Sequence, residues 1–149
     1  MKFRHLILAG LMLSLIITET SAQTTPTEIT DKFFSIYSKD PIKAVEYAFA
    51  TNKWVDKKQD AIVGVKNKIK NLTELVGDYY GYELLTVKTA GPSVKIMTFV
   101  VKYDREPLRF IFLMYKAKDT WRVNNFSFDE ELGDELTESA KAYRLKENY

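Results

Sequence analysis

The chain has 149 residues, of which 46% are hydrophobic, 13% aromatic and 28% charged, and its formal net charge is +2. At about 150 residues per domain, this length predicts one domain, and the composition excludes a disordered chain, a collagen-like chain and a disulfide-rich mini-protein. The small net charge does not indicate a polyanionic partner, and the basic surface typical of nucleic-acid binding is not expected.

Residues 1–22 show the three parts of a secretory signal peptide. Two basic residues lie near the N-terminus, residues 6–17 carry no charge, and small residues at 20–22 precede a cut before Gln23. The uncharged run is shorter than the ~20 apolar residues that a membrane-spanning helix needs. No cysteine is present to carry a lipid anchor. We therefore expect an exported protein, periplasmic or extracellular, with no membrane span after cleavage.

Removing this segment changes the chemistry that the chain can perform. The loss of two of the 22 basic and one of the 20 acidic residues leaves 20 and 19, a net charge of +1, and the only histidine, His5, is lost as well. Residues 23–149 contain neither histidine nor cysteine. They therefore lack the side chains of Ser-His-Asp and Cys-His catalysis and of the usual zinc sites. No metal or cofactor is expected.

Apolar residues recur at helical spacing in three segments that follow a polar leader at residues 23–27. We expect Thr27 to cap the first helix, Pro41 to begin the second after Asp40, and Gly77 to end the third in a left-handed conformation. The three predicted helices are Glu28–Ser38, a segment from Pro41 through Phe49, and Asp60–Val76.

The second half of the chain changes to the alternating pattern of strands. Aromatic and β-branched residues dominate it, and short polar turns separate the runs, which predicts an antiparallel meander. The two middle strands are apolar on both faces, whereas a sheet with one solvated face should alternate cleanly. The four predicted strands are Tyr79–Ala90, Val94–Tyr103, Leu108–Lys116 and Thr120–Phe128.

Residues 129–149 form a charged tail. Its acidic residues come first and its basic residues last, an order that suits a helix dipole. Gly133 lies near its start, and Leu132, Leu136, Ala140 and Tyr143 fall on one helical face. The tail is therefore predicted to be a marginal C-terminal helix.

The order of three helices followed by four strands, over about residues 28–128, resembles the nuclear transport factor 2-like (cystatin-like, SnoaL-like) superfamily. The most specific part is the hairpin that joins the run 110–116 to Trp121-Arg122-Val123, because small exported bacterial members often end in a lysine, a turn and a Trp-basic-aliphatic run. The resemblance implies an α+β fold in which three N-terminal helices pack on a curved antiparallel β-sheet. The resulting cone is a pocket, an active site or a core, and the outer sheet face often forms a dimer.

Two kinds of binding follow from these patterns. The outer face of the two-sided apolar sheet needs a cover, which can be a second subunit, an envelope protein or the terminal helix, and a homodimer is expected. The cone can hold a small apolar ligand on its aromatic residues, although packing as core or interface is the commoner use of such residues. The candidate ligand-binding residues are Trp54, Tyr80, Tyr82, Phe99, Phe110, Phe112 and Trp121.

The alternative function is an enzyme of the ketosteroid-isomerase type, which works with a carboxylate base and tyrosine instead of histidine. Glu83 is the only acidic residue within the predicted strands. A single carboxylate without a matched partner does not make a catalytic constellation, so a non-catalytic protein is expected. The polar strand residues that can point into the cone are Tyr82, Lys95, Thr98, Tyr103, Arg109, Arg122 and Asn124.

Overall fold

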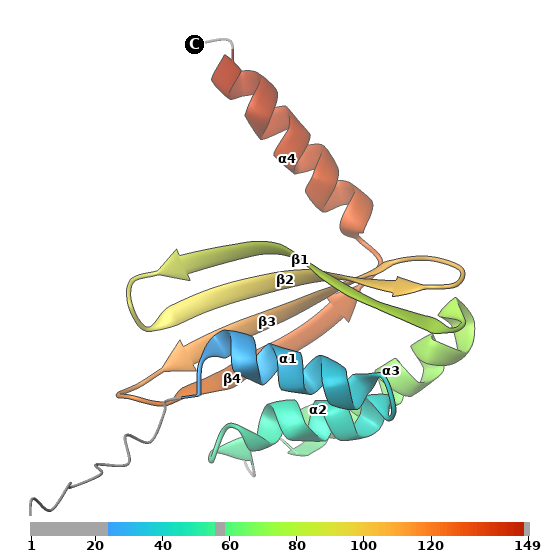
Figure 1. The fold of residues 1–149 in the computed structure, drawn as a ribbon, viewed down its shortest axis with the longest axis vertical. Coiled ribbons are helices and arrows are strands. Elements are labelled where there is room, and N and C mark those ends of the chain that lie inside the picture. Colours follow the sequence, from blue (N-terminus) through green and yellow to red (C-terminus); the bar gives the residue numbers. More distant parts are fainter. Residues whose placement is uncertain (1–23, 56–58, 148–149) are drawn as a thin grey trace, which may run out of the picture.

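The computed structural model describes residues 24–55 and 59–147, and Figure 1 shows its arrangement. Three helices pack on one side of an open four-stranded antiparallel sheet, and a fourth helix follows. This confirms the predicted α+β class. The predicted signal peptide and its cut before Gln23 lie outside the described residues and stay predictions. The elements are α1 (Pro26–Tyr37), α2 (Pro41–Ala50), α3 (Gln59–Val76), β1 (Tyr79–Ala90), β2 (Val94–Tyr103), β3 (Leu108–Lys116), β4 (Trp121–Asp129) and α4 (Leu132–Glu147).

Capping residues set the ends of the helices. α1 begins at Pro26, because Thr25 and Glu28 form a reciprocal capping box: the Thr25 hydroxyl accepts from the Glu28 N–H at 3.2 Å and the Glu28 carboxylate accepts from the Thr25 N–H at 2.6 Å. The prediction that Thr27 caps this helix is therefore wrong by two residues. The cap of α2 by Asp40, with proline first, and the left-handed Gly77 (φ +85°) after α3 are confirmed.

The sheet is a meander in which each strand pairs with its neighbours in the chain, in the order β1-β2-β3-β4. The predicted bounds of β1, β2 and β3 are confirmed, and β4 lies one residue later than predicted at each end. The reason is that Asp129 continues the ladder opposite Arg109. Two register shifts in β1 and one between β3 and β4 interrupt the pairing, and such bulges increase the local twist of a sheet.

The core lies between α1 and the inner face of the sheet. Phe33 and Phe34 of α1 are fully buried, and the Phe33 ring meets those of Phe112 and Phe126 at centroid distances of 4.9 and 5.2 Å. Phe34 stacks on Tyr82 at 3.8 Å. α2 and α3 contribute buried residues such as Val45 and Ile69 to the same cluster. Among the described residues, the helical layer thus covers one face of the sheet and no helix packs on the other.

α4 behaves differently from the first three helices. Figure 1 shows it leaving the end of β4 and projecting away from the helical layer. Two apolar side chains of its predicted face are exposed, Leu136 at 56% and Tyr143 at 65%. It therefore forms a helix, as predicted, without covering the sheet. Within the described residues, each helix is either too short or too polar to cross a bilayer.

Candidate functional site

The structure separates the seven predicted ligand-binding residues into three groups. Phe99, Phe110 and Phe112 are buried in the core, and Tyr82 is half-buried against Phe34. Tyr80 is exposed, and its hydroxyl donates to Asp104 at 3.2 Å. The remaining two are at the opposite end of the sheet: an exposed Trp54 and a buried Trp121.

Aromatic side chains occupy the space where a cone pocket would lie. The rings of Phe110 and Phe126 meet at 5.4 Å, and those of Phe112 and Phe126 at 4.8 Å. Deeper toward the α1 C-terminus, the hydroxyls of Tyr37 and Tyr103 share a short hydrogen bond between buried side chains. The candidate residues Phe99, Phe110 and Phe112 therefore pack in the core of this structure. Their binding of an apolar ligand stays a prediction.

The acidic residue expected on the strands lies away from this interior. Glu83 is paired across the sheet with Val100, next to the inward-facing Tyr82, and its carboxylate binds the Lys102 ammonium at 2.8 Å. Tyr82 instead donates its hydroxyl to Asp31 at 3.0 Å. β4 adds a second strand acid, Asp129, that the predicted bounds left out.

The outer face of the sheet carries an apolar patch on its two middle strands. On β2, the more exposed Ile96, Val100 and Lys102 lie on the outward side together with Thr98, which is buried. The register brings the outward residues of β3 beside them. Ile96 pairs with Leu113 and is 42% exposed. We use the name outer sheet face for the patch formed by Val94, Ile96, Val100, Ile111, Leu113 and Tyr115.

Charged side chains of both signs border the outer sheet face. Lys102 and Glu83 lie at one corner as an ion pair, and Lys88 pairs with Ile96 from the edge strand. Of the polar residues that were expected to point into the cone, Thr98, Arg109 and Arg122 belong to this outward set, because they pair with Ile111, Val100 and Tyr115. That expectation is wrong for these three residues, since the alternation of the strands turns them away from α1.

Arg109 ties α4 to the corner of this surface. Its guanidinium makes a bidentate contact with Asp129, with both N–O distances at 2.9 Å, and reaches Glu135 at 3.0 Å and Glu131 at 3.3 Å. Its side chain is only 15% exposed. Burial opposes ionisation of Asp129, but hydrogen bonds from Arg109 and from the Glu131 N–H outweigh it and hold the Asp129 pKa below its usual value.

We expect Arg109→Met to lower the free energy of unfolding by about 1–3 kcal/mol, because three carboxylates lose their shared partner. A folded-state pKa below 3.8 for Asp129 means that its contribution is present above pH 3.8 and is lost as the pH falls through that lowered pKa. Urea unfolding between pH 3 and 7 measures both effects. Lys102→Met is the matched control, since its exposed pair with Glu83 should contribute no more than about 1 kcal/mol. Equal losses in the two variants would contradict the prediction.

Sequence reasoning missed the Arg109 cluster because its carboxylates come from a strand end and from the tail, which no local spacing connects. The one available signal was the run of acidic residues that begins at Asp129.

The architecture is compatible with a nuclear transport factor 2-like fold, in that three helices pack on an antiparallel sheet. Comparison with known proteins adds no relative: no family model, curated protein or solved structure matches the chain.

Proposed function

We propose that the protein is a non-catalytic, exported binding domain of nuclear transport factor 2-like architecture, which pairs with a second copy of itself through the outer sheet face. The observation that carries this proposal is the apolar patch on β2 and β3, which lies opposite the helical layer. Ile96 at its centre is 42% exposed, and neither the three packed helices nor α4 covers it. Exposed apolar patches bordered by polar residues typically mark interaction surfaces.

The charges at the border favour a second copy over a strongly charged partner. A twofold interface brings the same patch of both subunits together, so its surface must be complementary to itself. The border carries cations such as Lys88 and Lys102 and anions such as Glu83 and Asp129. With both signs present, each cation of one copy can meet an anion of the other. A border of one sign would repel its own copy.

The whole outward side of the sheet, which consists of the outer sheet face and its charged border, is large enough for such a pair. Four strands about 4.8 Å apart and about nine residues long at ~3.4 Å per residue cover roughly 600 Å² per copy. Two copies together then bury roughly 1,200 Å², above the ~1,000 Å² that separates specific interfaces from incidental contacts. α4 projects beyond the sheet (Figure 1) and offers exposed Leu136 and Tyr143 as additional contact area.

Two observations support a non-catalytic role. The carboxylate of Glu83 is held by Lys102 on the outward side, whereas a ketosteroid-isomerase-type base would have to face a substrate in the cone. The interior is filled by ring contacts such as Phe33 with Phe112. The predicted apolar ligand, by contrast, has to compete with these side chains for space.

The test is sedimentation velocity of the purified protein, with Ile96→Glu as the disrupting variant. We expect a dimer for the wild type at micromolar concentration and a monomer for Ile96→Glu, because the twofold axis places the new charge in the interface twice. Leu75→Glu is the matched control, since Leu75 is an exposed apolar residue of α3 at 63%, and it should stay dimeric. Circular dichroism establishes that both variants are folded.

A monomeric wild type, or equal dissociation of the two variants, would overturn the proposal. Native mass spectrometry of the wild type then separates the alternatives. An adduct of small-molecule mass would favour ligand binding in the cone, and a second polypeptide would identify an envelope partner.

A further inference from the structure

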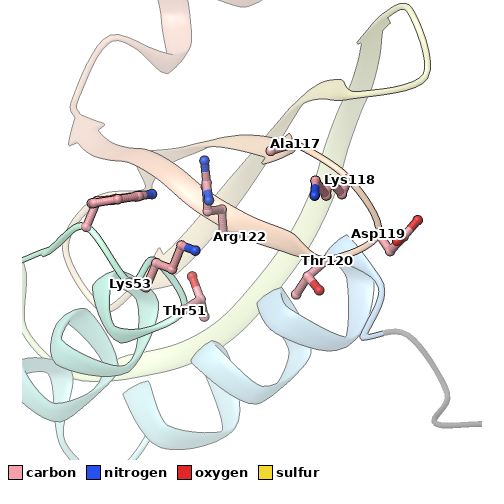
Figure 2. A pocket seen from close by; sticks show the side chains of 8 residues that line it. Thr51, Lys53, Ala117, Lys118, Asp119, Thr120 and Arg122 are labelled. Atoms are coloured by element: carbon pink, nitrogen blue, oxygen red, sulfur yellow. The ribbon is translucent and has the colours of Figure 1, made fainter.

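A cleft opens at the end of the sheet opposite α4. It lies between the segment after α2 and the turn that joins β3 to β4, and it encloses about 680 Å³. This volume falls within the 300–1,000 Å³ typical of small-molecule sites. Figure 2 shows its side chains, which are Thr51, Lys53, Trp54, Ala117, Lys118, Asp119, Thr120 and Arg122.

Hydrogen bonds hold the two walls of the cleft together. The Thr51 hydroxyl accepts from the Val123 N–H at 2.8 Å and donates to the Ala48 carbonyl at 2.7 Å, which joins the end of α2 to β4. Asn52, which is 8% exposed, accepts from the Trp54 N–H at 3.1 Å. The cleft is therefore built on positions that the fold fixes before any ligand arrives.

The charge in the cleft is strongly one-sided. Lys53, Lys118 and Arg122 line it against a single acid, Asp119. None of the three cations forms an ion pair with a carboxylate among the residues that the structure describes. Figure 2 shows the Lys53 ammonium directed toward the base of Arg122, whose guanidinium points away from it. An anion in the cleft would be attracted by all three cations.

Two further lysines strengthen the positive potential nearby. Lys95 and Lys116 lie over the ring of Trp121, at 5.3 and 5.2 Å from its centroid, and Trp121 directly follows a residue that lines the cleft. Cations can approach aromatic faces in this way without a carboxylate. These two lysines add positive charge on β2 and β3, strands that carry no acidic residue.

The described part of the chain restricts the Arg122 side chain but leaves one of its N–H donors without a hydrogen-bond partner. Its guanidinium carbon lies 5.1 Å from the ring centroid of Tyr115, which restricts the side chain. Its Nε atom is buried and has no hydrogen-bond partner within the described part of the chain. Unpaired buried donors are uncommon in folded proteins, and a restricted guanidinium is suited to bind carboxylate or phosphate groups.

We propose that this cleft binds a small molecule through an anionic carboxylate or phosphate group, which Lys53, Lys118 and Arg122 contact. The hydroxyl of Thr120 adds a neutral donor at the same turn. This site adjoins the outer sheet face, because Arg122 packs on Tyr115, but Lys53 and Lys118 are not among the residues of that face.

The test is an NMR titration of the ¹⁵N-labelled protein with inorganic phosphate and, separately, with acetate, at constant pH and ionic strength. We expect saturable amide shifts at Thr51, Lys53 and residues 118–122 for at least one anion. The anion that saturates at the lower concentration identifies the group that the site prefers.

A double variant, Lys53→Ala with Lys118→Ala, should weaken this binding by about tenfold or more, because it removes two charged contacts and a tenfold loss already corresponds to one of them. Both side chains are exposed, so the fold should persist. Lys39→Ala, at an exposed lysine after α1, is the matched control and should bind as the wild type does. Shifts that never saturate for either anion, or equal affinity in the double variant and the wild type, would overturn the proposal.

Discussion

Replacing Phe33 with alanine is expected to lower the free energy of unfolding by about 3–5 kcal/mol, the largest effect of any single substitution considered for this protein. Phe33 is fully buried on α1. Its ring packs against three rings on two strands of the sheet. The ring centroids of Phe110, Phe112 and Phe126 lie 6.4, 4.9 and 5.2 Å from its own. Truncation therefore removes one of the main contacts between the helical layer and the sheet and leaves a cavity between them.

Urea unfolding followed by circular dichroism measures this loss. Leu75→Ala serves as the control, because Leu75 is 63% exposed on α3, and changes at such surface positions usually stay within about 0.5 kcal/mol. A loss below about 1 kcal/mol for Phe33→Ala would mean that the interior is loosely packed. That outcome would favour a cone that binds a small apolar ligand.

Alkaline pH is expected to cause the second-largest loss of stability. Burial is the main reason that the pKa of Tyr103 rises from 10.0 to about 12, and burial also raises the pKa of its partner Tyr37. A pKa that is higher in the folded than in the unfolded chain gives stability that is complete below pH 10 and is lost as the pH rises from 10 through 12. A rise of two pKa units at Tyr103 corresponds to roughly 3 kcal/mol in the free energy of unfolding.

The free energy of unfolding, measured in urea at intervals from pH 8 to 12, checks this. Tyr103→Phe should show a shallower decline between pH 10 and 12, because one of the buried ionisable groups is gone, and it should cost about 1 kcal/mol near neutrality through the lost hydrogen bond with Tyr37. Tyr143→Phe is the control, as Tyr143 is 65% exposed. If Tyr103→Phe declined as steeply as the wild type, the hydroxyl pair would not be the source of the alkaline sensitivity.

The sequence predicted the elements well because their signals are local. Asp40 and Pro41 mark the start of α2, Gly77 marks the end of α3, and the strand bounds follow from the change of period and the turn residues. The start of α1 was misplaced because two threonines are available there, and only the position of Glu28 relative to Thr25 decides between them.

The candidate sites were harder to predict because they depend on residues far apart in the chain. The cleft joins Lys53 to Lys118 and Arg122, which no local spacing in the sequence connects. Arg109 was assigned to the wrong side of the sheet, since alternation in β3 gives two faces but does not say which one the helices cover. Only the packing of α1 against Phe110 and Phe112 fixes that choice.

The meander also determines the order in which this chain is expected to fold. Each strand pairs only with a neighbour in sequence, so closing each short turn costs little entropy, and hairpins of this kind form in about 1–10 μs. Docking the helices is different, because the hydrogen bond between Thr51 and Val123 joins residues 72 positions apart. We therefore expect the sheet to assemble early, hairpin by hairpin. The rate-limiting step is then the closure of the helical layer over it, the step that also creates the basic cleft.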